Sequence, residues 1–276
     1  MGTELRQRRV DLVVESVRIT GLRVVFDAKK SLAKEPNSLD LRIYNLSKQT
    51  RSSLQGRGLK VLLLAGYQNE IGQIFSGDSR TCDHVYEKPD WVTRIQCGDG
   101  EVKYRTSRFV ESFAPGTQVA DVLEACARAL GVGIGNAKVR FQQALPRNFQ
   151  QFVQGFAAHG NAAQYMDMLV RSAGLAWSIQ DGELQVLSTT EVNTDEVVLL
   201  TPKTGLIGSP VHGSPDKKGG LSTLKVRSLL QHKLRPGGRF KLEADSIRGV
   251  FRVEKLGHNG DTASGPWYTD LEAKPA

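Results

Sequence analysis

Two pairs of short segments in this chain repeat at the same spacing, and this repeat restricts the fold more than any other feature. Residues 71–75 (IGQIF) resemble residues 247–251 (IRGVF), and residues 91–97 (WVTRIQC) resemble residues 267–273 (WYTDLEA). Both pairs lie 176 positions apart, from 75 to 251 and from 91 to 267. Self-similarity at a fixed spacing predicts that one structural unit occurs twice in the chain.

Two further matches extend the repeat toward the N-terminus. Residues 58–65 (GLKVLLLA) align with 237–244 (GGRFKLEA) at a spacing of 179 (58 to 237), and residues 39–42 (LDLR) align with 224–227 (LKVR). Any two β-hairpins share alternating apolar residues and a glycine turn, so each match alone has an ordinary explanation. That explanation accounts less well for Ile, Phe, Trp and Thr in one register over 27 positions. We therefore interpret the chain as a duplication.

The repeated segments have the alternation of half-buried β-strands. Leu39, Leu41 and Ile43 alternate with polar neighbours, which is the period of a strand with one buried face. Ser47 is a candidate N-cap for a short helix over residues 49–54. A segment rich in Gly, Pro, Ser and Lys, residues 201–220, predicts a long connecting loop. The β-rich segments are residues 10–19, 22–26, 59–65, 71–79, 91–97, 224–229, 239–244, 247–256 and 267–273.

The middle third of the chain has a different pattern. Apolar residues at helical spacing predict a helix over residues 119–130, ended by Gly131. A second helix is expected to begin at Asn161, with Gln164 completing a capping box. An Asp-Gly turn at residues 181–182 predicts a hairpin, whereas residues 149–156 suit a helix or a strand equally. The expected buried stripe of the second helix is Tyr165, Met168 and Leu169.

These patterns together predict a mainly β fold with an α+β insertion. Two related antiparallel β-barrels are expected to flank a small α/β domain. The expected domains are residues 1–104, a first β-barrel; 105–187, the inserted α/β domain; and 188–276, a second β-barrel.

Composition excludes several classes of protein. With 276 residues, 39% hydrophobic and 24% charged, the chain has the composition of an ordinary folded protein. Three cysteines without a CxxC spacing argue against a disulfide framework and favour a reducing site of synthesis. The N-terminal segment has no apolar stretch typical of a signal peptide, and the longest apolar run, residues 61–65, is too short to span a membrane.

Residue patterns of enzymes are nearly absent from the sequence. The SxxK spacing of Ser31 and Lys34 precedes a Glu-Pro turn and not a helix, so it is not a catalytic motif. The glycines of residues 131–135 follow a helix, which indicates a helix end and not a dinucleotide site. We therefore expect no enzymatic activity and no catalytic, cofactor-binding or metal-binding residue. The scattered histidines and carboxylates considered are His84, His159, His212, His232, His258, Asp78, Asp99 and Glu101.

A net charge of +8 leaves a nucleic-acid partner open. Basic residues gather at the N-terminus and in the C-terminal third, and a barrel with basic strands is able to follow a phosphate backbone. An acidic protein partner fits the charge equally well. The basic residues are Arg6, Arg8, Arg9, Lys217, Lys218, Lys225, Arg227, Lys233, Arg235, Arg239 and Lys241.

A set of short strings is spread along nearly the whole chain. They are residues 22–26 (LRVVF), 35–38 (EPNS), 43–47 (IYNLS), 65–67 (AGY), 75–78 (FSGD), 112–116 (SFAPG), 177–182 (WSIQDG), 205–210 (GLIGSP), 234–237 (LRPG) and 265–270 (GPWYTD). In this order they resemble one family, the baseplate or tail hub proteins of contractile-tailed bacteriophages, of the T4 hub type and similar to late control protein D. None of the strings is a catalytic signature, so the resemblance depends on their order and number.

The resemblance implies a structural subunit made in the host cytoplasm and located in the virion, in the tail baseplate. Members form a homotrimer whose two tube-like barrels per chain make a ring of pseudo-six-fold symmetry, which adapts the six-fold tail tube to the three-fold central spike. The implied partners are further copies of the chain, the spike, the tube or tube-initiator protein and the tape measure protein, while genomic DNA passes through the lumen without specific binding. The alternatives are a nucleic-acid-binding protein with OB-like barrels and, last, a peptidoglycan hydrolase.

Overall fold

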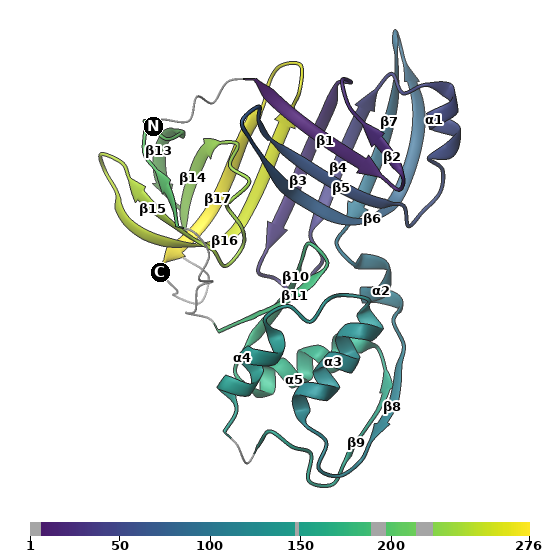
Figure 1. Cartoon of the computed structure of the whole chain (residues 1–276). Coiled ribbons are helices and arrows are strands. Elements are labelled where there is room, and N and C mark those ends of the chain that lie inside the picture. Colours follow the sequence, from purple (N-terminus) through teal and green to yellow (C-terminus); the bar gives the residue numbers. More distant parts are fainter. Residues whose placement is uncertain (1–6, 147–148, 189–196, 214–222) are drawn as a thin grey trace. The chain divides into compact units, whose positions relative to one another are not determined.

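The structure is a computed structural model that describes residues 7–146, 149–188, 197–213 and 223–276 (Figure 1). The chain divides into two compact units. The first contains the described parts of residues 1–32, 37–97 and 192–276, and the second those of residues 33–36 and 98–191. The expected mainly β fold with an α+β insertion is confirmed. Within the described ranges, every helix is too short or too polar to cross a bilayer.

The first part of the first unit is a curved sheet that we call module 1. Its strand order is β3-β4-β7-β6-β5-β1-β2. The expected alternation is present in β4, where Leu39, Leu41 and Ile43 are buried. As expected, Ser47 caps the helix α1, because its hydroxyl accepts a hydrogen bond from the Thr50 amide at 3.1 Å. The elements are β1 (Arg8–Val14), β2 (Val17–Ile19), β3 (Val24–Ser31), β4 (Ser38–Tyr44), α1 (Lys48–Ser53), β5 (Lys60–Tyr67), β6 (Glu70–Glu87) and β7 (Asp90–Gly98).

The C-terminal part of the same unit is a second curved sheet, module 2. Its strand order is β13-β14-β17-β16-β15-β12. Phe240 and Phe251 face each other across β15 and β16 and stack in its core with ring centroids 5.8 Å apart. The elements are β12 (Val198–Leu200), β13 (Leu206–His212), β14 (Leu224–Leu229), β15 (Arg239–Glu243), β16 (Arg248–Asp261) and β17 (Trp267–Pro275).

The two modules share the order of five strands. The run β3-β4-β7-β6-β5 of module 1 corresponds to β13-β14-β17-β16-β15 of module 2. A hydrogen bond recurs with it: His84 Nδ1 contacts Thr93 Oγ1 at 2.9 Å, and His258 Nδ1 contacts Thr269 Oγ1 at 2.9 Å. The two modules are therefore related, as the repeat predicts. They differ at the outer strand, since β1 is antiparallel to β5 whereas β12 is parallel to β15.

One part of the sequence alignment is wrong by two residues. The recurring bond joins His84 to Thr93, nine positions apart, but His258 to Thr269, eleven positions apart. The chain between the two bonded residues is therefore two residues longer in module 2 than in module 1. Thr93 and Thr269 still correspond at a spacing of 176, but β6 and β16 correspond at 174 (84 to 258), so Phe75 and Phe251 are not equivalent. A shift of two keeps every side chain on its expected face, which is why the alternation did not reveal it.

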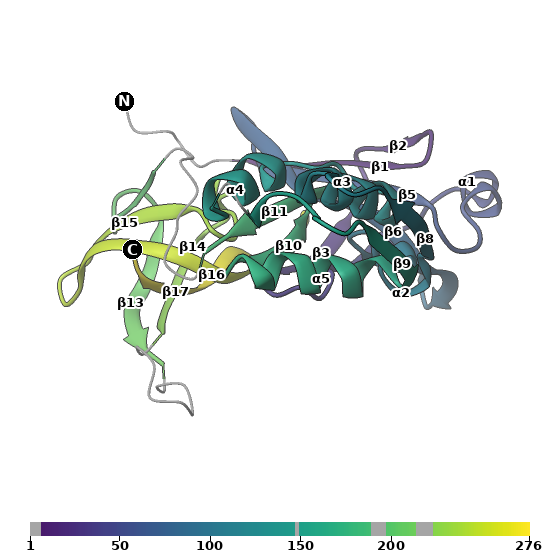
Figure 2. The same ribbon diagram turned by 90° about the horizontal axis from the view of Figure 1, so that it is seen from below.

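The second compact unit is a small α/β assembly (Figure 2). The helices α3 and α5 pack on each other, and α5 also packs on the hairpin β10–β11. Gly131 ends α3 in the left-handed conformation (φ 67°), and Asn161 caps α5 by accepting a hydrogen bond from the Ala163 amide at 2.8 Å, both as expected. The elements are α2 (Glu101–Thr106), β8 (Phe109–Phe113), α3 (Val119–Leu130), α4 (Ala137–Ala144), β9 (Phe156–Gly160), α5 (Ala162–Ser172), β10 (Ala176–Gln180) and β11 (Glu183–Leu187).

Two local expectations are wrong. Part of the segment expected to be a loop, residues 206–212, is the strand β13, because Leu206 and Ile207 pair with β14 and a bulge accommodates the glycine and proline that follow. In α5 the side chain of Met168 is exposed and that of Met166 is buried, because the buried face of the helix includes Ala162, Met166, Leu169 and Val170.

Candidate assembly interface

Module 2 is joined to module 1 through the strands β16 and β3. These strands pair antiparallel over seven residue pairs, from Lys255 opposite Ser31 to Asp261 opposite Val25. The pairing makes one continuous sheet of thirteen strands. A single chain therefore already contains one complete contact between two related modules.

Trp267 of module 2 anchors this junction inside the core of module 1. Its ring makes edge contacts with Phe26 at a centroid distance of 5.6 Å and with Tyr67 at 6.5 Å. Trp267 is only 4% exposed, and Leu230 of module 2 is buried in the same cluster. Burial of an indole side chain of about 200 Å² contributes on the order of 5 kcal/mol, so this one residue is a major part of the attraction between the modules.

Charged groups fix the orientation of the junction. The Arg23 guanidinium donates two hydrogen bonds to the carboxylate of Asp261, at 3.2 and 2.7 Å. Burial raises the pKa of Asp261, but the bonds from Arg23 and from the amides of Ala263 and Ser264 outweigh it, so the pKa is lowered below its usual value. A second pair, Lys233 to Glu70 at 3.1 Å, joins the β14–β15 connection to the β5–β6 hairpin.

Two glycines allow the close approach of the modules. A Cβ atom on Gly260 would lie 2.2 Å from Cζ of Phe26, and one on Gly72 would lie 2.0 Å from Cδ2 of His232. Both distances are far below ordinary contact, so any side chain at these positions would displace an aromatic ring. Gly260, Gly72 and the Arg23–Asp261 pair were missed by the sequence reasoning, because each depends on a contact between residues distant in sequence.

The histidines considered as ligands are dispersed in the fold. His258 is fully buried, and burial, with smaller contributions from Lys30 and His232, lowers its pKa to about 3. His84 bonds Thr93 and the Leu54 carbonyl, and His159 is an exposed residue of β9. Among the described residues, no group of three or more His, Cys, Asp or Glu side chains is arranged to hold a metal ion.

The other candidate polar residues have structural partners. Lys34 pairs with Asp167 at 3.3 Å, and Asp78 with Lys60 at 2.6 Å. The Asp99 carboxylate accepts hydrogen bonds from the amides of Asp181 and Gly182, at 2.6 and 2.9 Å, and so holds the β10–β11 turn. The three thiols are free, and burial raises the pKa of Cys82 to about 11 and those of Cys97 and Cys126 to about 12.

Several residues of the expected basic surface are paired with carboxylates. Arg227 bonds Asp270 at 2.6 and 3.2 Å, and Lys241 pairs with Glu243 at 2.7 Å. Arg8 lies 5.5 Å from the Trp267 ring and donates to the Asp261 carbonyl. The pairs with Asp270 and Glu243 reduce the positive charge presented to a phosphate backbone. Arg6, Lys217 and Lys218 lie outside the described residues.

Comparison with solved structures identifies the fold. The 43 kDa tail protein of prophage MuSo2 from Shewanella oneidensis superposes with a TM-score of 0.68 at 7% identity, covering 98% of each chain. A tail protein from Neisseria meningitidis MC58 superposes with a TM-score of 0.64 at 13% identity, covering 98% of this chain and 97% of the other. The chain has the fold of phage tail proteins.

A third structure with this fold comes from a secretion apparatus. The E. coli c3393 protein is described as a component of the type VI secretion system with structural similarity to the T4 tail proteins gp27 and gp5. It superposes with a TM-score of 0.61 at 9% identity, covering 96% of this chain and 76% of the other. Neither a protein-family model nor a curated protein matches the sequence. The tail-protein fold is thus recognisable in the arrangement of the strands and not in overall sequence identity.

Proposed function

We propose that the chain is a structural, non-enzymatic subunit of a phage tail, the hub of its baseplate. The observation that carries this proposal is the presence of two modules with one strand order in a single chain, joined edge to edge by β3 and β16. Three such chains in a closed ring present six related modules while keeping three-fold symmetry. A ring of this kind is able to adapt a six-fold tube to a three-fold spike.

The proposed partners follow from this position. They are two further copies of the chain, the central spike, the tube or its initiator protein, and the tape measure protein, with genomic DNA passing through the lumen without specific binding. The described similarity of the c3393 protein to both gp27 and gp5 supports a place next to a spike. The domain boundaries proposed with this function remain residues 1–104, 105–187 and 188–276.

The experiment is to locate the chain in assembled tails. A C-terminal affinity tag on the full chain is labelled with gold in purified particles and imaged by negative-stain electron microscopy. We expect one cluster of label at the baseplate end of each tail. Label distributed along the tube, or a chain that does not sediment with tails, would refute the proposal. Filter binding to single-stranded DNA at two salt concentrations tests the nucleic-acid alternative, which requires a steep salt dependence and a defined site size.

A further inference from the structure

We infer that a second copy of this chain docks on module 1 through β6, which pairs with β13 of that copy as β16 pairs with β3 inside one chain. The inference rests on the proposed function and deepens it by naming the two surfaces that meet. The contact is head to tail, because the two surfaces differ. Repeated head-to-tail contacts close into a ring when their rotation allows it.

Equivalent hydrogen bonds show which residues of the two modules correspond. In module 1 the Asn45 amide donates to the Trp91 carbonyl at 2.7 Å. In module 2 the Leu230 amide donates to the Trp267 carbonyl at 3.2 Å. Positions in β4 and β14 therefore correspond at a spacing of 185 (45 to 230), and positions in β7 and β17 at 176 (91 to 267). The recurring His–Thr bonds relate β6 to β16 at 174.

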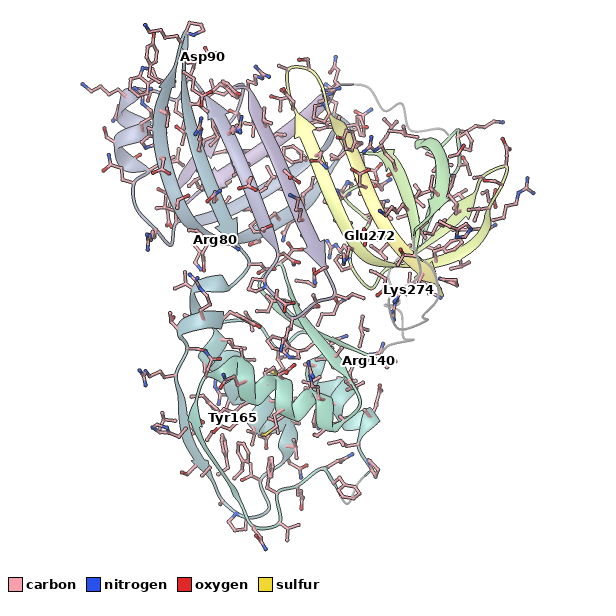
Figure 3. The ribbon with its side chains drawn as sticks, turned by 180° about the vertical axis from the view of Figure 1, so that it is seen from behind. Arg80, Asp90, Arg140, Tyr165, Glu272 and Lys274 are labelled. Atoms are coloured by element: carbon pink, nitrogen blue, oxygen red, sulfur yellow. The ribbon has the colours of Figure 1, made fainter. Side chains whose placement is uncertain are left out.

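Two strand edges correspond to the paired edges of β3 and β16 but have no strand beside them in the described part of the chain. The first is β13, which ends the sheet. The second is residues 81–87 of β6, because β5 pairs with β6 only as far as Asp78. These residues correspond to 255–261 of β16, the stretch that pairs with β3. In Figure 3 Arg80 labels β6 just before this stretch, and Asp90 labels the start of β7 after the turn that follows it. Figure 1 shows β13 at the opposite side of this unit.

The register carried over from the internal junction places two exposed valines opposite each other. Inside the chain, Asn259 faces Asp27. Asn259 corresponds to Val85 at the spacing of 174. Asp27 pairs with Asp40 of β4, and Val211 pairs with Lys225 of β14. Because Asp40 and Lys225 correspond at the spacing of 185, Asp27 corresponds to Val211. Val85 is 37% exposed and Val211 is 59% exposed. Docking removes both side chains from water, which favours association.

The two equivalent tryptophans differ in exposure, because only one of them lies in a contact between modules that is formed within the chain. Trp267 is 4% exposed because the internal junction covers it, whereas Trp91 is 39% exposed. Trp91 lies against Tyr86, with ring centroids 5.3 Å apart, and under the guanidinium of Arg51 at 4.1 Å. An exposed tryptophan framed by an aromatic ring and an arginine has the composition of an interface core. A second copy in the inferred position covers it.

Charge complementarity gives the same direction of docking. Lys233, three residues after Leu230, pairs with Glu70 of the β5–β6 hairpin. Lys48 stands three residues after Asn45, and Asp245 lies at the tip of the β15–β16 hairpin, the counterpart of the β5–β6 hairpin. Both side chains are exposed, and neither has an ion-pair partner among the described residues. In the inferred contact, Lys48 of one copy approaches Asp245 of the next.

Disulfide cross-linking of the full chain at high concentration tests the register directly. The variant V85C/V211C carries one new thiol on each inferred edge, and opposed strand positions bring thiols within bonding distance. After oxidation we expect covalent dimers and trimers on a non-reducing gel, with the trimer as the largest abundant species. The control V85C/V250C also carries two exposed positions, but Val250 lies where β16 pairs with β15, so it is expected to stay monomeric, as are the single variants. V85C/V211C cross-linking no more than this control overturns the inference.

Two further readouts separate the interface from the proposed function. Because Trp177 and Trp267 are already buried, a blue shift of tryptophan emission on assembly reports the burial of Trp91. K48E and D245K are each expected to weaken association about tenfold, and the double variant K48E/D245K to recover most of it. A trimer by light scattering that shows neither the cross-link nor this recovery overturns the inferred interface and leaves the proposed ring intact. A chain absent from assembled tails refutes the proposed function itself.

Discussion

The variant Gly260→Ala tests how closely the modules must approach. Its Cβ atom would lie 2.2 Å from Cζ and 2.4 Å from Cε1 of Phe26, where carbon atoms normally stay about 3.5 to 4.0 Å apart. The Phe26 ring cannot turn away freely, because it is buried and held against Trp267. Overpacking of this kind typically costs 1–3 kcal/mol, and we expect a loss of about 2–3 kcal/mol in the free energy of unfolding of the first unit.

The assay is urea unfolding followed by tryptophan fluorescence in a Trp177→Phe background, so that the signal comes from the first unit alone. Gly257→Ala is the matched control on the same strand, since the nearest atom to its Cβ is the Asn259 Nδ2 at 3.7 Å, an ordinary contact. We expect that control to change stability by less than about 0.5 kcal/mol. Equal losses in the two alanine variants would refute the reasoning.

A double-mutant cycle identifies the clash itself. Phe26→Leu removes the ring atoms that the new Cβ meets and by itself costs about 1–2 kcal/mol through the cavity that it leaves. In the Gly260→Ala background we expect Phe26→Leu to cost at least about 1 kcal/mol less than it does alone, because residues in contact are not additive. Additive losses would show that the two residues do not meet at the junction.

Three further predictions concern groups inside the units. Because burial lowers the pKa of His258 to about 3, the unfolded chain takes up this proton at a higher pH than the folded chain. Stability is therefore expected to fall as pH decreases from about 6.5 toward 3, by roughly 3 kcal/mol at pH 4.5; denaturant titrations should give a flatter profile for His258→Gln. Asp99→Asn leaves two turn amides poorly paired and should destabilise the second unit by about 1–3 kcal/mol in thermal unfolding. Raised thiol pKa values predict that Cys82, Cys97 and Cys126 react slowly with a disulfide reagent at pH 8 and rapidly in urea; fast native labelling would contradict this.

Local pattern was sufficient for those parts of the fold that local interactions determine. Ser47 and Asn161 cap their helices as expected. Gly131 ends α3 because glycine, which has no Cβ atom, adopts the left-handed conformation without steric strain. The Trp91–Trp267 correspondence was also visible in the sequence, because strands keep their facing residues when a fold is duplicated.

The rest depends on contacts that a single segment does not encode. The shift between Phe75 and Phe251 comes from two extra residues between the bonded His and Thr of module 2. A shift of two leaves every side chain on the same face, so an alternation of period two does not reveal it. The strand β13 was hidden by Gly208 and Pro210, which are breakers in isolation but are accommodated by a bulge beside β14. The Lys233–Glu70 pair and the burial of Trp267 in the core of module 1 both depend on contacts between residues of different modules. Only the folded chain brings these residues together.

The most direct measurement of the central claim is a cryo-electron microscopy reconstruction of the assembled tail at the level of this chain. The account requires three copies in one ring, with six modules alternating between module 1 and module 2 and β6 of each copy beside β13 of the next. A ring of six copies, or a three-fold ring in which Trp91 still faces solvent, would contradict it.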